Sequence, residues 1–283
     1  MTTWPALGKV GVWRNASQVT PALAASLEEL GYGAVWLGGS PGGDLRIAED
    51  ILAATATLTV ATGIVNIWQD DAAAIGAAYH RIADAHPGRF LLGVGAGHRE
   101  ATARYAKPYD ALAAYLDGLD AAKVPVEGRA LAALGPKVLR LSAERSAGAH
   151  PYLTVPEHTR QAREILGDGV LLAPEQKVVV SEDTEAARRI AREIARETVH
   201  FYLRLSNYTN NLRRLGFGDD DLAGRGSDRL VDALVAQGDP ATIKRRVDEH
   251  LAAGADHVGI QLLTAEDQDP LPGYRALAEV LFA

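Results

Sequence analysis

Several side chains that can exchange protons or hydrogen bonds with a ligand stand directly after predicted β-strands. They are Ser40, Asn66, His98, His150, Tyr152, His158 and Gln261. In a barrel of parallel strands, the C-terminal strand ends meet at one mouth, where ligands are held. A histidine at this mouth is a candidate for proton transfer, because its ordinary pKa lies nearest neutrality. His86 and His257 stand where predicted strands begin, so we expect them to serve stability instead.

Alternating strand and helix signals predict the elements that position these residues. Apolar, β-branched segments predict strands near 9–13, 33–38, 58–65, 90–95, 129–134, 148–153, 176–181 and 257–262. Helical patterns occur at about 20–30, 44–56, 70–85, 108–121, 136–146, 156–166, 184–197 and 239–253. Eight strands that alternate with eight helices predict an α/β fold, the closed (β/α)8 TIM barrel. We therefore predict a single domain over residues 1–283.

Capping signals support the predicted helix boundaries. Thr20 and Asp239 each precede a proline at a helix start, which makes them predicted N-caps. Gly31 and Gly254 follow helix ends, where a left-handed residue commonly terminates the helix.

The regular spacing is interrupted over residues 198–237. This stretch holds two amphipathic segments around a polar, glycine-rich middle. It predicts a helical insertion before the last strand, lying over one end of the barrel.

Composition excludes several classes of function. The net charge is −7 and the positive residues are scattered, which argues against a nucleic-acid surface. No run of 18 apolar residues and no signal peptide occurs, so we expect no membrane partner. The chain has no cysteine, which fits a reducing cytoplasm. We expect a cytoplasmic protein with a small-molecule substrate.

One predicted helix, 184–197, carries a dense set of opposite charges. Its members are Arg188, Arg189, Arg192 and Arg196, interspersed with Glu185, Glu193 and Glu197. This spacing is typical of a solvated, ion-paired helix face rather than of a phosphate-binding surface.

Two other kinds of site are disfavoured. A metal site would have to collect His98, His150 and Asp256 from separate strands, but Asp256 precedes the final strand and so belongs at the opposite end of the barrel. We therefore expect no metal. A dinucleotide fingerprint through Gly93 and Gly95 requires Gly or Ala at position 98, where His98 stands instead.

The chain resembles the luciferase-like flavin and deazaflavin oxidoreductases. The similarity starts with TGIVN at 62–66 and HPGRFLLGVGAGH at 86–98. It continues in the family's order through KVGVW at 9–13, GYGAVWLGGS at 31–40, AALGPKVLRLSAERSAGAH at 132–150, PEHTRQAREILG at 156–167 and GDPATIKRRVDEHLAAGADHVGIQLL at 238–263. The branch that it matches best uses coenzyme F420.

The resemblance implies a cofactor site along four strand ends. The matching residues are Gly39, Gly63, Ile64, Val65, Asn66, Gly95, Ala96, Gly97, Ala133, Leu134, Gly135 and Pro136. It also implies a cis peptide bond between Gly63 and Ile64, which supports the central ring. Gly135 and Pro136 are also predicted to bind a phosphate for a separate physical reason. Free N–H groups at the start of a helix favour a negatively charged ligand. The alternative is that Gly135 and Pro136 merely end a strand and start a helix.

The chain departs from the family at one place that concerns catalysis. Sugar-phosphate dehydrogenases of the F420 branch carry an Asp-His pair where Gly39 and Ser40 stand here. Neither residue is a general base near neutral pH without an activating partner, which argues against sugar-phosphate oxidation. His98 is a candidate to hydrogen bond the reduced cofactor or the substrate, and the alternative is a helix-capping role. Ser40 and His98 are the predicted catalytic residues.

The resemblance implies an F420-dependent oxidoreductase that transfers a hydride between the deazaflavin C5 and an organic substrate, working as a homodimer. One alternative is an FMN-dependent monooxygenase on the same barrel. Another is a non-catalytic flavin-binding member, because the Asp-His pair is missing. The scaffold alone does not separate these activities.

Overall fold

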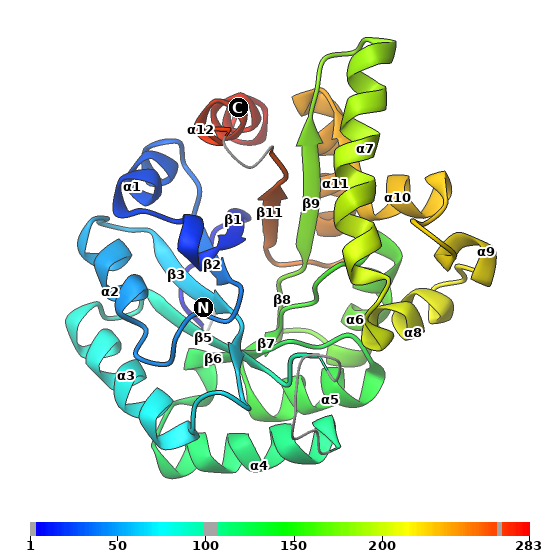
Figure 1. Cartoon of the computed structure of the whole chain (residues 1–283). Helices are drawn as coiled ribbons and strands as arrows, with labels where there is room; N and C mark the ends of the chain where they lie inside the picture. The colour runs from blue at the N-terminus through cyan, green and yellow to red at the C-terminus, as the bar shows by residue number, and fades with distance from the viewer. Residues whose placement is uncertain (1–3, 99–106, 265–267) are drawn as a thin grey trace.

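The structure, a computed structural model, describes residues 4–98, 107–264 and 268–283 (Figure 1). Its strands are β1 Val10–Asn15, β2 Ala34–Gly38, β3 Thr59–Gly63, β4 Val65–Asn66, β5 Phe90–Gly95, β6 Arg129–Leu131, β7 Gly148–Ala149, β8 Leu171–Leu172, β9 Glu175–Val180, β10 Val235–Gly238 and β11 Val258–Leu262. Its α-helices are α1 Pro21–Glu29, α2 Arg46–Ala53, α3 Ala72–Ala85, α4 Pro108–Ala121, α5 Pro136–Arg145, α6 Pro156–Leu166, α7 Glu185–Tyr202, α8 Ser206–Arg214, α9 Asp219–Leu222, α10 Asp228–Leu234, α11 Pro240–Ala252 and α12 Leu271–Leu281.

All strand pairs are parallel, and the helices lie outside the sheet (Figure 1). The ladder runs in the order β10-β9-β11-β1-β2-β3-β5-β6-β7-β8, with β4 beside β5. The segment 171–175 connects the two sides of this path. Ala173 N donates to Ala149 O of β7, and Gly259 N of β11 donates to Pro174 O, both at 2.9 Å. The predicted α/β barrel is therefore confirmed.

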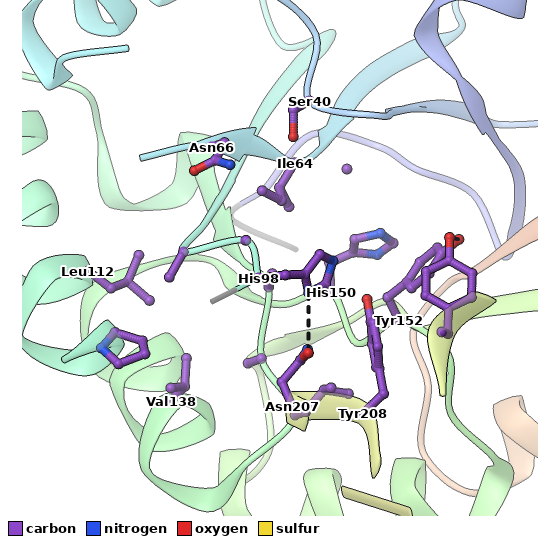
Figure 2. A pocket seen from close by; sticks show the side chains of 18 of the residues that line it. Ser40, Ile64, Asn66, His98, Leu112, Val138, His150, Tyr152, Asn207 and Tyr208 are labelled. Atoms are coloured by element: carbon purple, nitrogen blue, oxygen red, sulfur yellow. Dashed lines mark hydrogen bonds between the residues drawn. The ribbon is translucent and has the colours of Figure 1, made fainter. Parts of the chain in front are cut away.

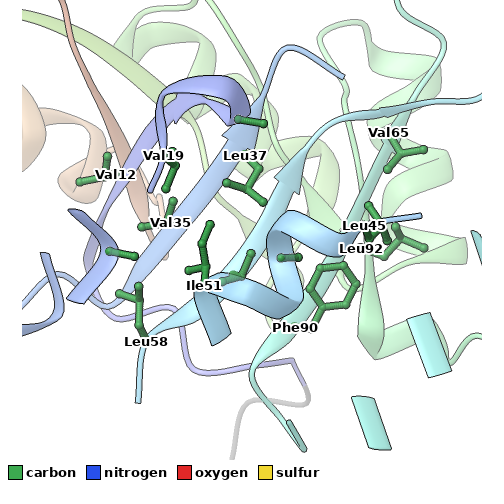
Figure 3. Packing of buried hydrophobic residues seen from close by; sticks show 14 of the residues in the cluster. Val12, Val19, Val35, Leu37, Leu45, Ile51, Leu58, Val65, Phe90 and Leu92 are labelled. Atoms are coloured by element: carbon green, nitrogen blue, oxygen red, sulfur yellow. The ribbon is translucent and has the colours of Figure 1, made fainter. Parts of the chain in front are cut away.

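The outward faces of the strands pack against the helices. Val12, Val35 and Leu37 point into this layer and belong to one buried cluster with Ile51 of α2 (Figure 3). These residues are shielded from water, and burial of this kind is worth about 25 cal/mol per Å² of apolar surface. This layer holds the strand ends in place.

The inward faces carry smaller residues and two large rings. Ala34, Ala61 and Ala130 form the interior cluster together with Trp13 and Trp36. Small side chains on neighbouring strands leave room for the two indoles inside the barrel. Because both faces of each strand are buried, the strand sequences are continuous apolar runs.

Three elements were not predicted from the sequence. β8 and β10 are short, and each is followed within two residues by a proline, Pro174 or Pro240. Proline is typical of loops, so these segments were not predicted as strands. α12 shows a helical pattern in Tyr274, Leu277 and Ala278, which are buried. It was missed because the eight predicted helices already completed a barrel.

The predicted insertion is helical. It contains the end of α7, then α8, α9 and α10, and it adds β10 to the sheet. The charged face of α7 pairs mainly with this insertion rather than along the helix: Arg192 bonds to Asp232, and Arg225 bonds to Glu193 at 2.5 Å. The predicted solvated, ion-paired face is therefore confirmed, and its partners come from the insertion.

Thr20 and Asp239 cap α1 and α11 as predicted, with side chains that accept from Leu23 N and Thr242 N. Gly31 and Gly254 have the positive φ values of 95° and 101° that end a helix in the left-handed region. No helix in the described residues is long and apolar enough to cross a membrane.

Candidate active site

A pocket of about 670 Å³ opens at the C-terminal ends of the strands. Its walls come from the ends of β1, β2 and β3, the segments after β5 and β6, and the insertion helices α7 and α8 (Figure 2). The pocket therefore lies where barrel polarity places the ligand-binding mouth.

The pocket brings together most of the residues predicted for the site. Those that line it are Gly39, Ser40, Gly63, Ile64, Asn66, Ala96, Gly97, His98, Ala133, Leu134 and Gly135, together with His150 and Tyr152. Val65 and Gly95 do not line the pocket, because both are buried within paired strands. Pro136 stays outside the lining as the first residue of α5.

The end of β3 forms one wall. The peptide bond between Gly63 and Ile64 is cis, as predicted. Ile64 packs beside the next strand, where a Cβ added to Gly95 would lie 3.1 Å from Ile64 Cγ1. The hydroxyl of Thr62 donates to Gly93 O at 2.7 Å and accepts from Gly93 N at 2.8 Å. These paired bonds tie β3 to β5 directly beneath the pocket.

The floor of the pocket rests on a stack of rings inside the barrel. His150 lies parallel to Trp36, with ring centroids 4.0 Å apart. The indole N–H of Trp36 donates to His257 Nε2 at 3.0 Å, and His257 Nδ1–H donates to Gly8 O at 2.9 Å. Burial lowers the pKa of His257 to about 4. His257 is thus a neutral support beneath the site and does not line the pocket, as its place before β11 predicted.

His98 faces the pocket from the segment after β5. Its Nδ1 lies 3.2 Å from Asn207 Oδ1 of α8, and its ring is 5.3 Å from the ring of Tyr208. The dashed line in Figure 2 marks the contact with Asn207. His98 therefore joins the barrel to the insertion across the pocket. The alternative helix-capping role concerns residues 99–106, which lie outside the described residues.

Ser40 follows β2 in a left-handed conformation, with φ of 55°. A Cβ on the neighbouring Gly39 would lie 2.8 Å from Asn15 Nδ2, so glycine allows β1 and β2 to approach here. Ser40 carries no side-chain hydrogen bond to the described residues, and no base is positioned to activate it. The geometry fits a ligand contact better than a nucleophile.

The start of α5 faces the same pocket. Gly135 is the N-cap, and no side chain of the described residues caps the first free N–H groups of the helix. Arg214 Nη2 of α8 would lie 3.7 Å from a Cβ on Gly135. Behind this turn, His158 Nε2–H donates to Leu134 O at 2.9 Å. An uncapped helix start beside a guanidinium is suited to an anion.

Tyr152 and Tyr202 form one wall of the pocket, the tyrosine wall, which separates the pocket from a buried ion pair. The hydroxyl of Tyr152 donates to Gln261 Oε1 at 2.8 Å and lies 2.6 Å from the Tyr202 hydroxyl. Lys177 Nζ stands 3.7 Å above the Tyr152 ring and 3.0 Å from Glu175 Oε1. Burial raises the pKa of Glu175 and lowers that of Lys177 to about 8. Gln261 and His158, both predicted at the mouth, therefore act behind the lining rather than in it.

Other lining residues were not predicted. Trp13 and Asn15 come from the end of β1, where the same rule of strand ends applies. Asn207, Tyr208 and Arg214 come from α8, and no local pattern in the sequence says which face of this helix turns to the barrel.

The three candidate metal ligands are not brought together, because Asp256 lies away from the pocket that His98 and His150 line. Asp256 accepts a hydrogen bond from Arg163 at 2.7 Å at the other end of the barrel. Among the described residues, no three His, Asp or Glu side chains are placed to hold a metal ion.

Comparison with known proteins agrees with this architecture. Residues 4–124 match the family model of the luciferase-like monooxygenases. No curated protein sequence matches the chain significantly.

Several solved structures share the fold. An F420-dependent secondary alcohol dehydrogenase in complex with an F420-acetone adduct has a TM-score of 0.75 at 13% identity, covering 96% of this chain and 97% of that one. The coenzyme F420-dependent tetrahydromethanopterin reductase from Methanopyrus kandleri has a TM-score of 0.68 at 14% identity, covering 99% of each chain. The oxygenating constituent of 3,6-diketocamphane monooxygenase from Pseudomonas putida, in complex with FMN, has a TM-score of 0.70 at 13% identity and 95% coverage of each chain. Residues 4–124 therefore match the luciferase-like monooxygenase family model, and the chain shares the fold of these solved structures over nearly its whole length.

Proposed function

We propose that this chain is an F420-dependent oxidoreductase that transfers a hydride between the deazaflavin C5 and an organic substrate. The observation that carries the proposal is that one pocket unites the two segments that resemble the F420 branch, residues 62–66 and 132–136, with the end of β2 at Gly39 and Ser40.

The pocket residues fit a tricyclic ring with a phosphate-bearing chain. Gly63 and Gly135 leave the wall free of side chains at two separate points, and Ile64 presents an apolar surface between strands. The uncapped start of α5 and Arg214 offer donors for one phosphate. Both F420 and FMN carry such a phosphate, so this part of the fit serves either cofactor.

Bound F420 would supply the hydride acceptor and donor, while the protein supplies position and electrostatics. We assign Ile64 to support the ring and the start of α5 to hold the phosphate. His98 and Ser40 would contact the substrate or the ring edge. The tyrosine wall would exclude water from the reacting face.

Equilibrium titration of the purified protein tests the proposal. We expect F420 to bind more tightly than FMN, as followed by the absorbance or fluorescence of each cofactor. Riboflavin, which lacks the phosphate, is the control for the α5 contact and should bind more weakly than FMN. Micromolar FMN binding without measurable F420 binding would instead favour the monooxygenase, and binding of neither cofactor would favour a non-catalytic member.

Two histidine variants separate the site from its support. We expect His98→Ala to reduce cofactor affinity or turnover with little change in stability, because His98 lines the pocket. His257→Ala should lower the free energy of unfolding by about 3 kcal/mol, because it leaves the Trp36 N–H and Gly8 O unpaired. Denaturant unfolding and cofactor titration measure the two effects. A His257→Ala protein of normal stability that fails to bind cofactor would contradict this assignment.

A further inference from the structure

Two buried polar atoms on the pocket floor have no hydrogen-bond partner among the described residues. They are Nε1 of Trp13, at the end of β1, and Nε2 of His150, just after β7. Trp13 is 7% exposed and His150 is 2% exposed, and both residues line the pocket. Unpaired groups at such depth are costly, so each one calls for an explanation.

The two atoms have opposite hydrogen-bonding character. An indole nitrogen can only donate. His150 Nδ1 lies 2.7 Å from Ala173 O, which can only accept, so Nδ1 carries the proton of the neutral ring. Nε2 is then left with a lone pair. Burial lowers the pKa of His150 to about 4, with smaller contributions from His257 and Lys177, and thus keeps this lone pair available at neutral pH.

Both atoms surround one point beside Gly63. A Cβ built on this glycine would lie 2.7 Å from Trp13 Nε1 and 3.2 Å from His150 Nε2. The neighbouring polar groups are engaged elsewhere: the Tyr152 hydroxyl bonds to Gln261, and the Trp36 N–H bonds to His257. The Trp13 donor and the His150 acceptor therefore lie on the same side of Gly63, close enough for one ligand oxygen that stands clear of the glycine Cα to bond to both.

We propose that Trp13 and His150 bind a neutral hydroxyl group of the substrate, whose oxygen accepts from Trp13 and whose proton is donated to His150. One hydroxyl oxygen does both, whereas a ketone oxygen would place its lone pairs against that of His150. A carboxylate would meet the same lone pair and is disfavoured. The inference deepens the proposed function, because it names the substrate of the same pocket as a hydroxyl-bearing compound.

The indole N–H signals of ¹⁵N-tryptophan-labelled protein provide the test. The chain has 4 tryptophans, and Trp13→Phe identifies the signal of Trp13 while keeping an aromatic ring beside Tyr152. The probes are cyclohexanol and cyclohexanone, which have nearly the same shape. We expect cyclohexanol to shift the Trp13 signal and to bind about tenfold more tightly than cyclohexanone.

Two variants separate the contribution of the Trp13 donor from that of the His150 acceptor. Trp13→Phe should weaken cyclohexanol binding about tenfold, and His150→Phe should bring the alcohol-to-ketone affinity ratio close to one. Trp4→Phe, outside the pocket lining, is the control and should change neither value. The thermal unfolding of each variant verifies that it folds, and Trp13→Phe alone suffices if His150→Phe does not.

An unmoved Trp13 signal, or equal affinity of the unaltered protein for the alcohol and the ketone, would overturn the proposal. FMN and lumiflavin, which lacks the ribityl chain, distinguish the source of the hydroxyl. If FMN alone shifts the Trp13 signal and lumiflavin does not, the hydroxyl belongs to the cofactor, and the assignment to substrate is wrong. These measurements need no bound F420. A failed F420 titration would therefore contradict the proposed function without deciding whether Trp13 and His150 bind a hydroxyl group.

Discussion

Replacing Lys177 by methionine is expected to lower the free energy of unfolding by about 3–5 kcal/mol. Lys177 and Glu175 form an ion pair at 3.0 Å, and their side chains are 0% and 1% exposed. Removal of the ammonium leaves the Glu175 carboxylate, among the described residues, with the Leu153 N–H as its remaining hydrogen-bond partner. It also removes the cation that lies over the Tyr152 ring, so the tyrosine wall of the pocket should loosen.

Chemical denaturation measures this loss, and two further variants interpret it. Lys244→Met removes an exposed pair with Asp248 on α11 and should cost less than about 1 kcal/mol. The double variant Glu175→Gln with Lys177→Met should recover much of the lost stability, because no buried charge is left unpaired. If Lys177→Met costs no more than Lys244→Met, the buried pair does not stabilise this wall.

Replacing Gly93 by alanine is expected to cost about 3 kcal/mol or more and to disrupt ligand binding. The added Cβ would lie 1.9 Å from the backbone oxygen of Thr62, which cannot rotate away. β3 and β5 would have to separate, and both hydrogen bonds between Thr62 and Gly93 would weaken. Because Gly63 and Ile64 follow Thr62 directly, the pocket wall would move with them.

Gly218→Ala is the matched control for Gly93→Ala. A Cβ at Gly218 meets no atom within 4 Å, and the residue has an ordinary φ of −78°. We expect its stability to change by less than about 1 kcal/mol. Denaturant midpoints and cofactor titration compare the two variants, and equal behaviour would show that the β3–β5 approach tolerates a methyl group.

Features that depend on short stretches of chain were predictable from the sequence. Strand and helix periodicity identified the barrel, and Thr20 and Asp239 cap their helices through residues three positions away. Gly63, Ile64, Asn66 and Gly135 were placed at the pocket by motif and by the rule that parallel strand ends share one mouth. Each of these depends on local backbone geometry, which nearby side chains determine.

Only the tertiary structure decided which side chains from distant segments contact one another across the barrel. Trp13 and His150 are 137 positions apart in the sequence, yet both surround Gly63. The contact of His98 with Asn207 depends on which face of α8 turns inward. The sequence pattern assigns each side chain to the inside or the outside of its own element. Sheet register and the docking of the insertion then decide its neighbours, because these arise from packing between distant segments.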